Sequence, residues 1–188
     1  MALQKKDNWK FKKWFTVYAP AVFGGNIVVG EMPANSDKNV LNRNIRISLN
    51  SLTNNPSHMY TTAVLKVSEI NGDNLNTKLS ELRLPYSYLR SLVRRYRSIS
   101  NSRVEGVTKD GAKTVLKTLV VTRERSPHTK IVGIRKEMTD YLKNMLPNST
   151  YDEVVKSIME GKLQSDIKSS VEHIAKVNRV EVVALEFK

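Results

Sequence analysis

The sequence of 188 residues contains no cysteine, which excludes disulfide bonds and thiolate metal sites and fits a reducing compartment. Histidine is nearly as scarce, because only His58, His128 and His173 occur and they are widely separated. A histidine-rich metal cluster is therefore not expected. Neither a metal nor a cofactor is predicted for this protein.

Long apolar segments are also missing. Residues 1–13 contain no apolar stretch of the kind found in a secretory signal. The longest uncharged run, residues 14–30, is interrupted by Pro20, Gly24 and Gly25, and it is short for a membrane span. We expect a cytoplasmic protein.

Recognisable catalytic motifs are absent. The chain has no Walker phosphate-binding loop, no dinucleotide-binding glycine fingerprint and no nucleophile elbow. Gly24-Gly25 predicts a turn, and Asp152-Glu153 predicts the acidic first turn of a helix. Only Glu105, Asp110 and Glu124 are acidic within residues 90–135, which is weak support for two-metal chemistry. We predict that the protein is not an enzyme; a nucleic-acid enzyme whose site is assembled from distant residues is the alternative.

Acidic residues are few relative to basic ones. The chain has 18 Asp and Glu against 31 Lys and Arg, which gives a net charge of +13. Residues 1–20 carry +4 and residues 90–135 carry +9, so the rest of the chain is neutral in sum. Concentration of charge into two blocks indicates a polyanionic partner, either nucleic acid or an anionic membrane surface.

The second basic block begins with residues 86–97, which are predicted to form an amphipathic helix. No acidic residue lies within four positions of Arg94, so the arginines of this helix have no local partner of opposite charge. We interpret them as phosphate ligands, and a solvated charged face is the alternative. The face expected to dock on the core holds Tyr86, Leu89, Val93 and Tyr96, and the opposite face holds Arg90, Arg94 and Arg97, with Arg95 between them.

Hydrophobic periodicity predicts an α+β fold: a small antiparallel β-barrel or strongly curved sheet, flanked by about four helices. Asn71-Gly72-Asp73 and Asp110-Gly111 mark two hairpins, and Thr150 to Glu153 is typical of a capping box. Strands are expected over residues 14–18, 27–30, 45–49, 59–69, 75–79, 102–109, 112–122 and 179–187, and helices over 86–97, 131–146, 151–159 and 163–177.

The chain is divided by composition into two parts. Residues 1–20 form a basic N-terminal tail with the first strand, and residues 21–188 form a single α+β RNA-binding domain. Within this domain, residues 21–122 are β-rich, residues 131–177 are helical and residues 179–187 form a closing strand. The 40% hydrophobic content suits one compact domain.

Cations on the helix, on the second hairpin and at the start of the following helix are candidates for one contiguous phosphate-binding surface. In the tail, lysines alternate with Trp9 and Phe11, which suits stacking on bases; aromatics that cover a core edge are the alternative. The candidate RNA-binding residues are Lys5, Lys6, Lys10, Lys12, Lys13, Arg90, Arg94, Arg95, Arg97, Arg103, Lys109, Lys113, Arg123, Arg125, Lys130, Arg135 and Lys136.

Short motifs follow one another along nearly the whole chain: Lys13-Trp14, Val17-Tyr18-Ala19-Pro20, Leu65-Lys66-Val67, Ser91-Leu92-Val93-Arg94-Arg95, Val107-Thr108-Lys109-Asp110-Gly111, Ile134-Arg135-Lys136-Glu137-Met138, Gly161-Lys162 and Arg179-Val180-Glu181-Val182. Their order resembles the S-three-A-e family of small-subunit ribosomal proteins, found in archaea and eukaryotes. The chain departs from the family pattern at Leu84-Pro85-Tyr86, at residues 125–131 and at residues 175–178.

The resemblance implies a structural protein of the small ribosomal subunit that binds ribosomal RNA at the platform near the messenger exit and supports assembly and translation. The implied partners are small-subunit rRNA near its 3′ end, neighbouring platform proteins and messenger RNA near the exit, with no membrane. The implied fold, a small β-barrel with surrounding helices, agrees with the periodicity. A free-standing RNA- or DNA-binding protein is the alternative function.

Overall fold

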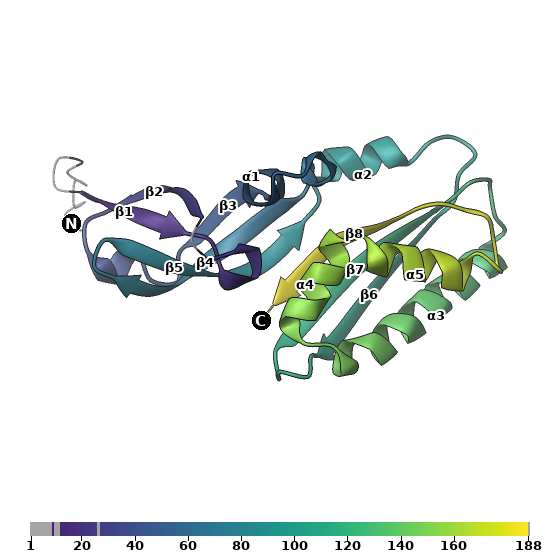
Figure 1. Ribbon diagram of the computed structural model, residues 1–188. Coiled ribbons are helices and arrows are strands. Elements are labelled where there is room, and N and C mark those ends of the chain that lie inside the picture. The colour runs from purple at the N-terminus through teal and green to yellow at the C-terminus, as the bar shows by residue number, and fades with distance from the viewer. Residues whose placement is uncertain (1–8, 10–11, 26, 188) are drawn as a thin grey trace, which may run out of the picture.

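The structure is a computed structural model that describes residue 9, residues 12–25 and residues 27–187. Figure 1 shows an elongated molecule, with strands of the first half at one end and a helical layer against strands of the second half at the other. The elements are β1 (Lys13–Tyr18), β2 (Val28–Ala34), β3 (Asn44–Ser48), α1 (Leu49–Thr53), β4 (Thr62–Asn71), β5 (Asn74–Arg83), α2 (Tyr86–Leu92), β6 (Ile99–Val107), β7 (Lys113–Thr122), α3 (His128–Met145), α4 (Tyr151–Met159), α5 (Lys162–Val171) and β8 (Val177–Phe187).

Strand β5 joins the two halves of the sheet. Along one edge it pairs antiparallel with β4 over its whole length. Along the other edge, its first residues pair in parallel with β1, and Glu81 to Arg83 pair antiparallel with β8. The resulting order is β2-β1-β5-β8-β7-β6, with β4 and β3 attached beside β5. A single 8-stranded sheet therefore runs through the whole molecule.

The predicted α+β fold is confirmed, but the sheet is open, so the small antiparallel barrel, one of the two predicted forms of the sheet, is supported only in part. The β1–β5 pair is parallel, and in the described part of the chain no ladder joins the edge strands β2 and β3. These two strands instead border a groove of about 340 Å³ that Val29, Met32 and Ile45 help to line. Side chains and open space separate the two edges, so their backbones cannot exchange hydrogen bonds.

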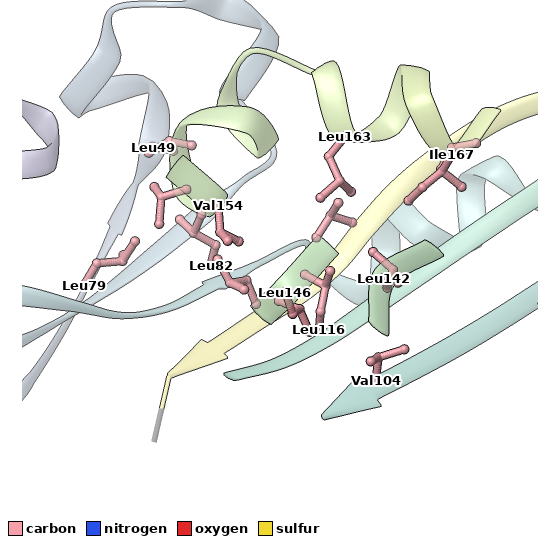
Figure 2. Packing of buried hydrophobic residues seen from close by; sticks show 14 of the residues in the cluster. Leu49, Leu79, Leu82, Val104, Leu116, Leu142, Leu146, Val154, Leu163 and Ile167 are labelled. Carbon is pink, nitrogen blue, oxygen red and sulfur yellow. The ribbon is translucent and has the colours of Figure 1, made fainter. Parts of the chain in front are cut away.

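Helices α3, α4 and α5 cover one face of the β6–β7–β8 part of the sheet (Figure 1). Helix α3 buries Ile134, Met138 and Leu142 completely, at the four-residue spacing that keeps side chains on one helix face. Figure 2 shows Leu142 near Val104 of β6, and Leu79 and Leu82 of β5 on the side of α4. The main core is thus continuous between β5 and the helical layer.

Hydrogen bonds join the start of α4 to the tip of the second hairpin and to β5. Thr150 and Glu153 form the predicted capping box, in which the Glu153 carboxylate accepts a hydrogen bond from the Thr150 N–H at 2.8 Å. The backbone N–H of Tyr151 donates to Asp110 Oδ2 at 2.7 Å, and its hydroxyl donates to the carbonyl of Leu79 at 2.8 Å. Burial raises the pKa of Tyr151 above its ordinary value. The tip of the second hairpin, α4 and β5 are therefore held together.

Several predicted boundaries are wrong for tertiary reasons. The five-residue helix α1 was not predicted, because its helical character depends on burial of Leu49 and Leu52 in the core. Helix α5 ends at Val171 rather than at residue 177, and β8 starts there instead. Strand β2 continues to Ala34, four residues beyond the predicted end at residue 30. Pairing with β1 supplies the hydrogen bonds that the local sequence does not indicate.

The predicted helix over residues 86–97 is wrong in its length and in its buried face. Helix α2 ends at Leu92, Val93 is extended, and Tyr96 has a positive φ of 63°. No residue of α2 is buried, and Val93 and Tyr96 are 42% and 81% exposed. A left-handed residue cannot continue an α-helix, so the arginines after Leu92 lie on a turn and not on a helix face.

We expect Gly106→Val to lower the free energy of unfolding by about 1–3 kcal/mol. A Cβ at Gly106 of β6 would lie 2.9 Å from Cδ1 of the fully buried Leu146, so the added side chain overpacks the core. Gly30→Val is the matched control, since a Cβ at Gly30 of β2 meets no atom within 4 Å. Urea unfolding measures both, and equal effects at the two sites would contradict the proposed steric cause.

We expect Val93→Ala to change the free energy of unfolding by about 0.5 kcal/mol or less, because the side chain is exposed. Leu142→Ala, in the main core, should cost about 2–5 kcal/mol in the same urea titration. A cost at Val93 comparable to that at Leu142 would mean that the segment after α2 packs on the core in solution.

Candidate nucleic-acid interface

A basic hollow forms where the segment after α2 meets the segment after β7. Its volume is about 420 Å³, and it is lined by Arg95, Tyr96, Arg97, Ser98 and Arg125. We call it the arginine hollow. Within the described residues, none of its three arginines forms an ion pair with a carboxylate. Three unneutralised guanidinium groups around one concavity suit a phosphate ligand.

Hydrogen bonds hold the two sides of the arginine hollow together. The Ser98 N–H donates to Thr122 Oγ1 at 2.9 Å, and the Ser126 N–H donates to Ser98 Oγ at 2.9 Å. Thr122 is 1% exposed, and its hydroxyl donates to the carbonyl of Glu124 at 2.6 Å. The backbones that carry Arg97 and Arg125 are therefore fixed relative to each other although their side chains reach solvent.

The other candidate cations of the second block are not all at this end. Arg94, Arg123 and Lys130 are exposed residues of the adjoining segments, whereas Lys109 and Lys113 flank the opposite end of the β6–β7 hairpin. Strand β6 has 9 residues. At about 3.3 Å per residue, a strand of this length places the two ends of the hairpin roughly 25–30 Å apart. The expected single surface is thus divided between the two ends of the hairpin.

Arg103, Arg135 and Lys136 lie between these ends. Arg103 Nη2 is 2.5 Å from Glu105 Oε1, and both side chains are about 60% exposed, so this arginine is already partly neutralised. Helix α3 begins at His128 and not at Ile131, which moves Arg135 and Lys136 from the predicted first turn to the third. The expectation that these two cations lie at the start of the helix is therefore wrong.

Helix α2 stands over the face of β6–β7–β8 that the other helices leave open. A groove of about 930 Å³ runs between them, and Leu89, Val93, Ile99 and Leu119 contribute to its apolar lining. Arg90 also borders the groove, and its guanidinium lies 4.7 Å from the centre of the Tyr86 ring. The apolar side of α2 thus faces a partly open groove instead of a closed core.

Strand β1, in the described part of the N-terminal block, lies at the end of the molecule opposite the segment that follows α2 (Figure 1). The candidates Lys5, Lys6 and Lys10 fall outside the described residues, and Phe11 does too. Lys13 begins β1, and Lys12 Nζ lies 4.7 Å from the Trp9 ring, which makes an edge contact with Trp14 at 6.0 Å. Both tryptophan residues are more than half exposed, so aromatic and cationic groups are again combined at the surface.

One aromatic cluster was not predicted from the sequence. Tyr60 and Tyr88 stack with ring centres 4.6 Å apart, and the Arg179 guanidinium lies 5.9 Å from the Tyr88 ring. The Tyr88 hydroxyl donates to Glu181 Oε1 at 3.2 Å; burial and then the Glu181 carboxylate raise the pKa of Tyr88. These residues come from α2, β8 and the segment before β4, so no sequence spacing could have paired them.

Among the described residues, no group of three or more His, Cys, Asp or Glu is placed to hold a metal ion. Nor, over the same residues, does any helix combine the length and apolar character that crossing a bilayer requires.

Comparison with known proteins covers almost the entire chain. The sequence model of the Ribosomal S3Ae family matches residues 2–187. A small ribosomal subunit protein eS1 from Sulfurisphaera tokodaii is 37% identical over 177 residues, which is 94% of this chain and 91% of the relative.

Two further relatives with the same name are similar. The protein from Methanococcus maripaludis strain S2 is 36% identical over 181 residues, 96% of this chain and 80% of the relative. The protein from Pyrobaculum neutrophilum is 32% identical over 186 residues, 99% of this chain and 83% of the relative. The resemblance seen in the short motifs is confirmed, and the chain belongs to the Ribosomal S3Ae family.

Proposed function

We propose that this protein is a structural component of the small ribosomal subunit that binds ribosomal RNA and contributes to translation in the cytoplasm. Membership of the Ribosomal S3Ae family over residues 2–187 is the observation that carries this function. The protein acts by binding and positioning, not as an enzyme. Neighbouring ribosomal proteins are its further partners.

The charge distribution supports the role of RNA. The arginine hollow presents guanidinium groups that no carboxylate of the described chain neutralises, on a backbone fixed by hydrogen bonds. Cations held in this way bind phosphates and set the orientation of folded RNA more than they read its bases. The candidate cations at the other end of the hairpin and in the N-terminal block are proposed as separate contacts with the same RNA.

The finer position of the protein is also part of the proposal. We infer a site at the platform of the subunit, near the messenger exit and the 3′ end of the small-subunit rRNA, with messenger RNA near the exit as a further partner. This position follows from the family resemblance. A map of ribosome cross-links from Arg94 and Lys113, which lie at the two ends of the second hairpin, tests it directly.

The alternative is a free-standing RNA- or DNA-binding protein, and sedimentation separates the two functions. In a cell extract at high Mg²⁺ and moderate salt, we expect the chain to co-sediment with the small subunit. Its consistent absence from that fraction, with binding to free RNA retained, would establish the alternative.

We expect simultaneous Arg90→Ala, Arg94→Ala and Arg97→Ala to weaken rRNA binding and to lower the slope of log K against log [salt] by roughly 2–3, since each lost phosphate contact removes about 0.7–0.9. The matched control replaces Lys38, Lys143 and Lys168 by Ala, which removes the same charge from exposed positions outside both basic blocks. Filter binding over a salt series measures the slopes. Equal slopes for the two triple variants would show that net charge alone, and not this segment, governs binding.

A further inference from the structure

Tyr96 has an unusual backbone conformation. Its φ of 63° is left-handed, and the other described non-glycine residues with positive φ are Asn42 and Asn54. Asparagine adopts this conformation readily because its short polar side chain bonds locally, whereas it is an outlier for a bulky residue. The strain stays within a short turn, in which the Arg97 N–H donates to the carbonyl of Arg94 at 3.3 Å.

The fold does not use the Tyr96 ring for its own packing. The residue is 81% exposed, more than any other large hydrophobic side chain of the described residues, and within that part of the chain its ring has no aromatic or hydrogen-bond partner. Glycine or asparagine would occupy this position without strain. A strained residue that the surrounding structure holds in place without a packing gain indicates a role in binding.

The surroundings of Tyr96 indicate the ligand. The ring shares the arginine hollow with Arg95, Arg97 and Arg125, and the volume of about 420 Å³ lies within the usual range of small-ligand pockets. An exposed aromatic face stacks on a nucleobase, and adjacent unpaired guanidinium groups bind phosphate. A base inside a duplex has both faces covered by its neighbours, so the ligand must be unstacked.

We propose that Tyr96 and the arginine hollow form a site for one unpaired nucleotide of RNA, whose base stacks on the ring and whose phosphate lies among the guanidinium groups. This proposal rests on the proposed RNA-binding function and identifies the kind of RNA feature that this end of the molecule takes. Specificity for single-stranded RNA resides at Tyr96, and the arginines supply the salt-dependent part of the affinity.

The test compares Tyr96→Gly with Tyr96→Phe, using fluorescein-labelled oligo(A) of about 12 nucleotides and an RNA duplex of about the same length as probes. We expect Tyr96→Gly to bind oligo(A) about 5- to 150-fold more weakly, because stacking of one base is lost. Tyr96→Phe should bind like the unaltered chain, since stacking does not need the hydroxyl. Duplex binding should be the same for all three proteins in fluorescence anisotropy titrations.

Thermal unfolding provides the control for folding. The melting midpoint of Tyr96→Gly should be unchanged or raised by up to about 4 °C, because relief of the left-handed strain offsets the greater freedom of glycine in the unfolded chain. Weaker binding by a protein that is no less stable cannot come from misfolding. A binding loss that accompanies a lower midpoint in Tyr96→Gly but not in Tyr96→Phe would overturn the proposal.

A salt series distinguishes stacking from phosphate binding. Arg125→Gln should lower the salt slope for oligo(A) by about 0.7, the value for one phosphate contact on a single strand, and Tyr96→Gly should leave the slope unchanged. Lys168→Gln on α5 is the matched control for the loss of one charge, and its slope should equal that of the unaltered chain.

Other outcomes reject the site and leave the broader function intact. Unchanged oligo(A) binding by Tyr96→Gly, an equal loss with the duplex, or an equal loss in Tyr96→Phe would each exclude stacking. Displacement of oligo(A) by polyglutamate at the same charge concentration would show a site for anions in general. Failure of the unaltered chain to bind either RNA or to co-sediment with the small subunit would reject the proposed function itself.

Discussion

Hydrogen bonding on both edges of β5 is the constraint on which the rest of the structure depends. One edge is occupied by β4, and the other is shared between β1 at its start and β8 at its end. The side chains of β5 are shared in the same way: Leu75 belongs to the small cluster of the first half, while Leu79 and Leu82 belong to the main core. Neither half of the sheet could move independently without breaking both a ladder and a core.

This arrangement also decides where the arginines lie. The chain leaves β5 at Arg83 and must reach the start of β6, at the end of the second hairpin farthest from its tip. The connection passes over the open face of the sheet, so α2 stays at the surface and its last turn gives way to the strained segment around Tyr96. Arg97 arrives beside Arg125 because β6 and β7 are paired, and Ser98, Thr122 and Ser126 fasten the two segments. Side-chain hydrogen bonds at the backbone keep the two segments from separating, so the guanidinium groups remain around one hollow although they repel one another. The proposed RNA phosphate would relieve this repulsion.

Prediction from the sequence succeeded where a local rule or the overall composition was sufficient. The hairpin at Asp110-Gly111 and the capping box at Thr150 depend on turn and cap chemistry within a few residues, and both are present. The two basic blocks were found by counting charged residues, and the family was identified from the order of short motifs. The prediction that residues 86–97 bury one helix face was wrong, because helical spacing does not reveal whether a core is available to the apolar face. Tyr96 was accordingly assigned to the buried side, although it is 81% exposed, the highest value among the large hydrophobic side chains of the described residues.

The sequence by itself determined the family, the basic character of the protein, the two hairpins and most of the helices, since each follows from residues close together in the chain. Only the tertiary structure decided that the sheet stays open and that the basic residues are separated between distant ends. It alone also stacked Tyr60 on Tyr88 and placed Arg97 and Arg125 around one hollow. The physical reason is that strand pairing and core packing join residues far apart in sequence, and these long-range contacts determine which of the locally possible surfaces remain exposed to a partner.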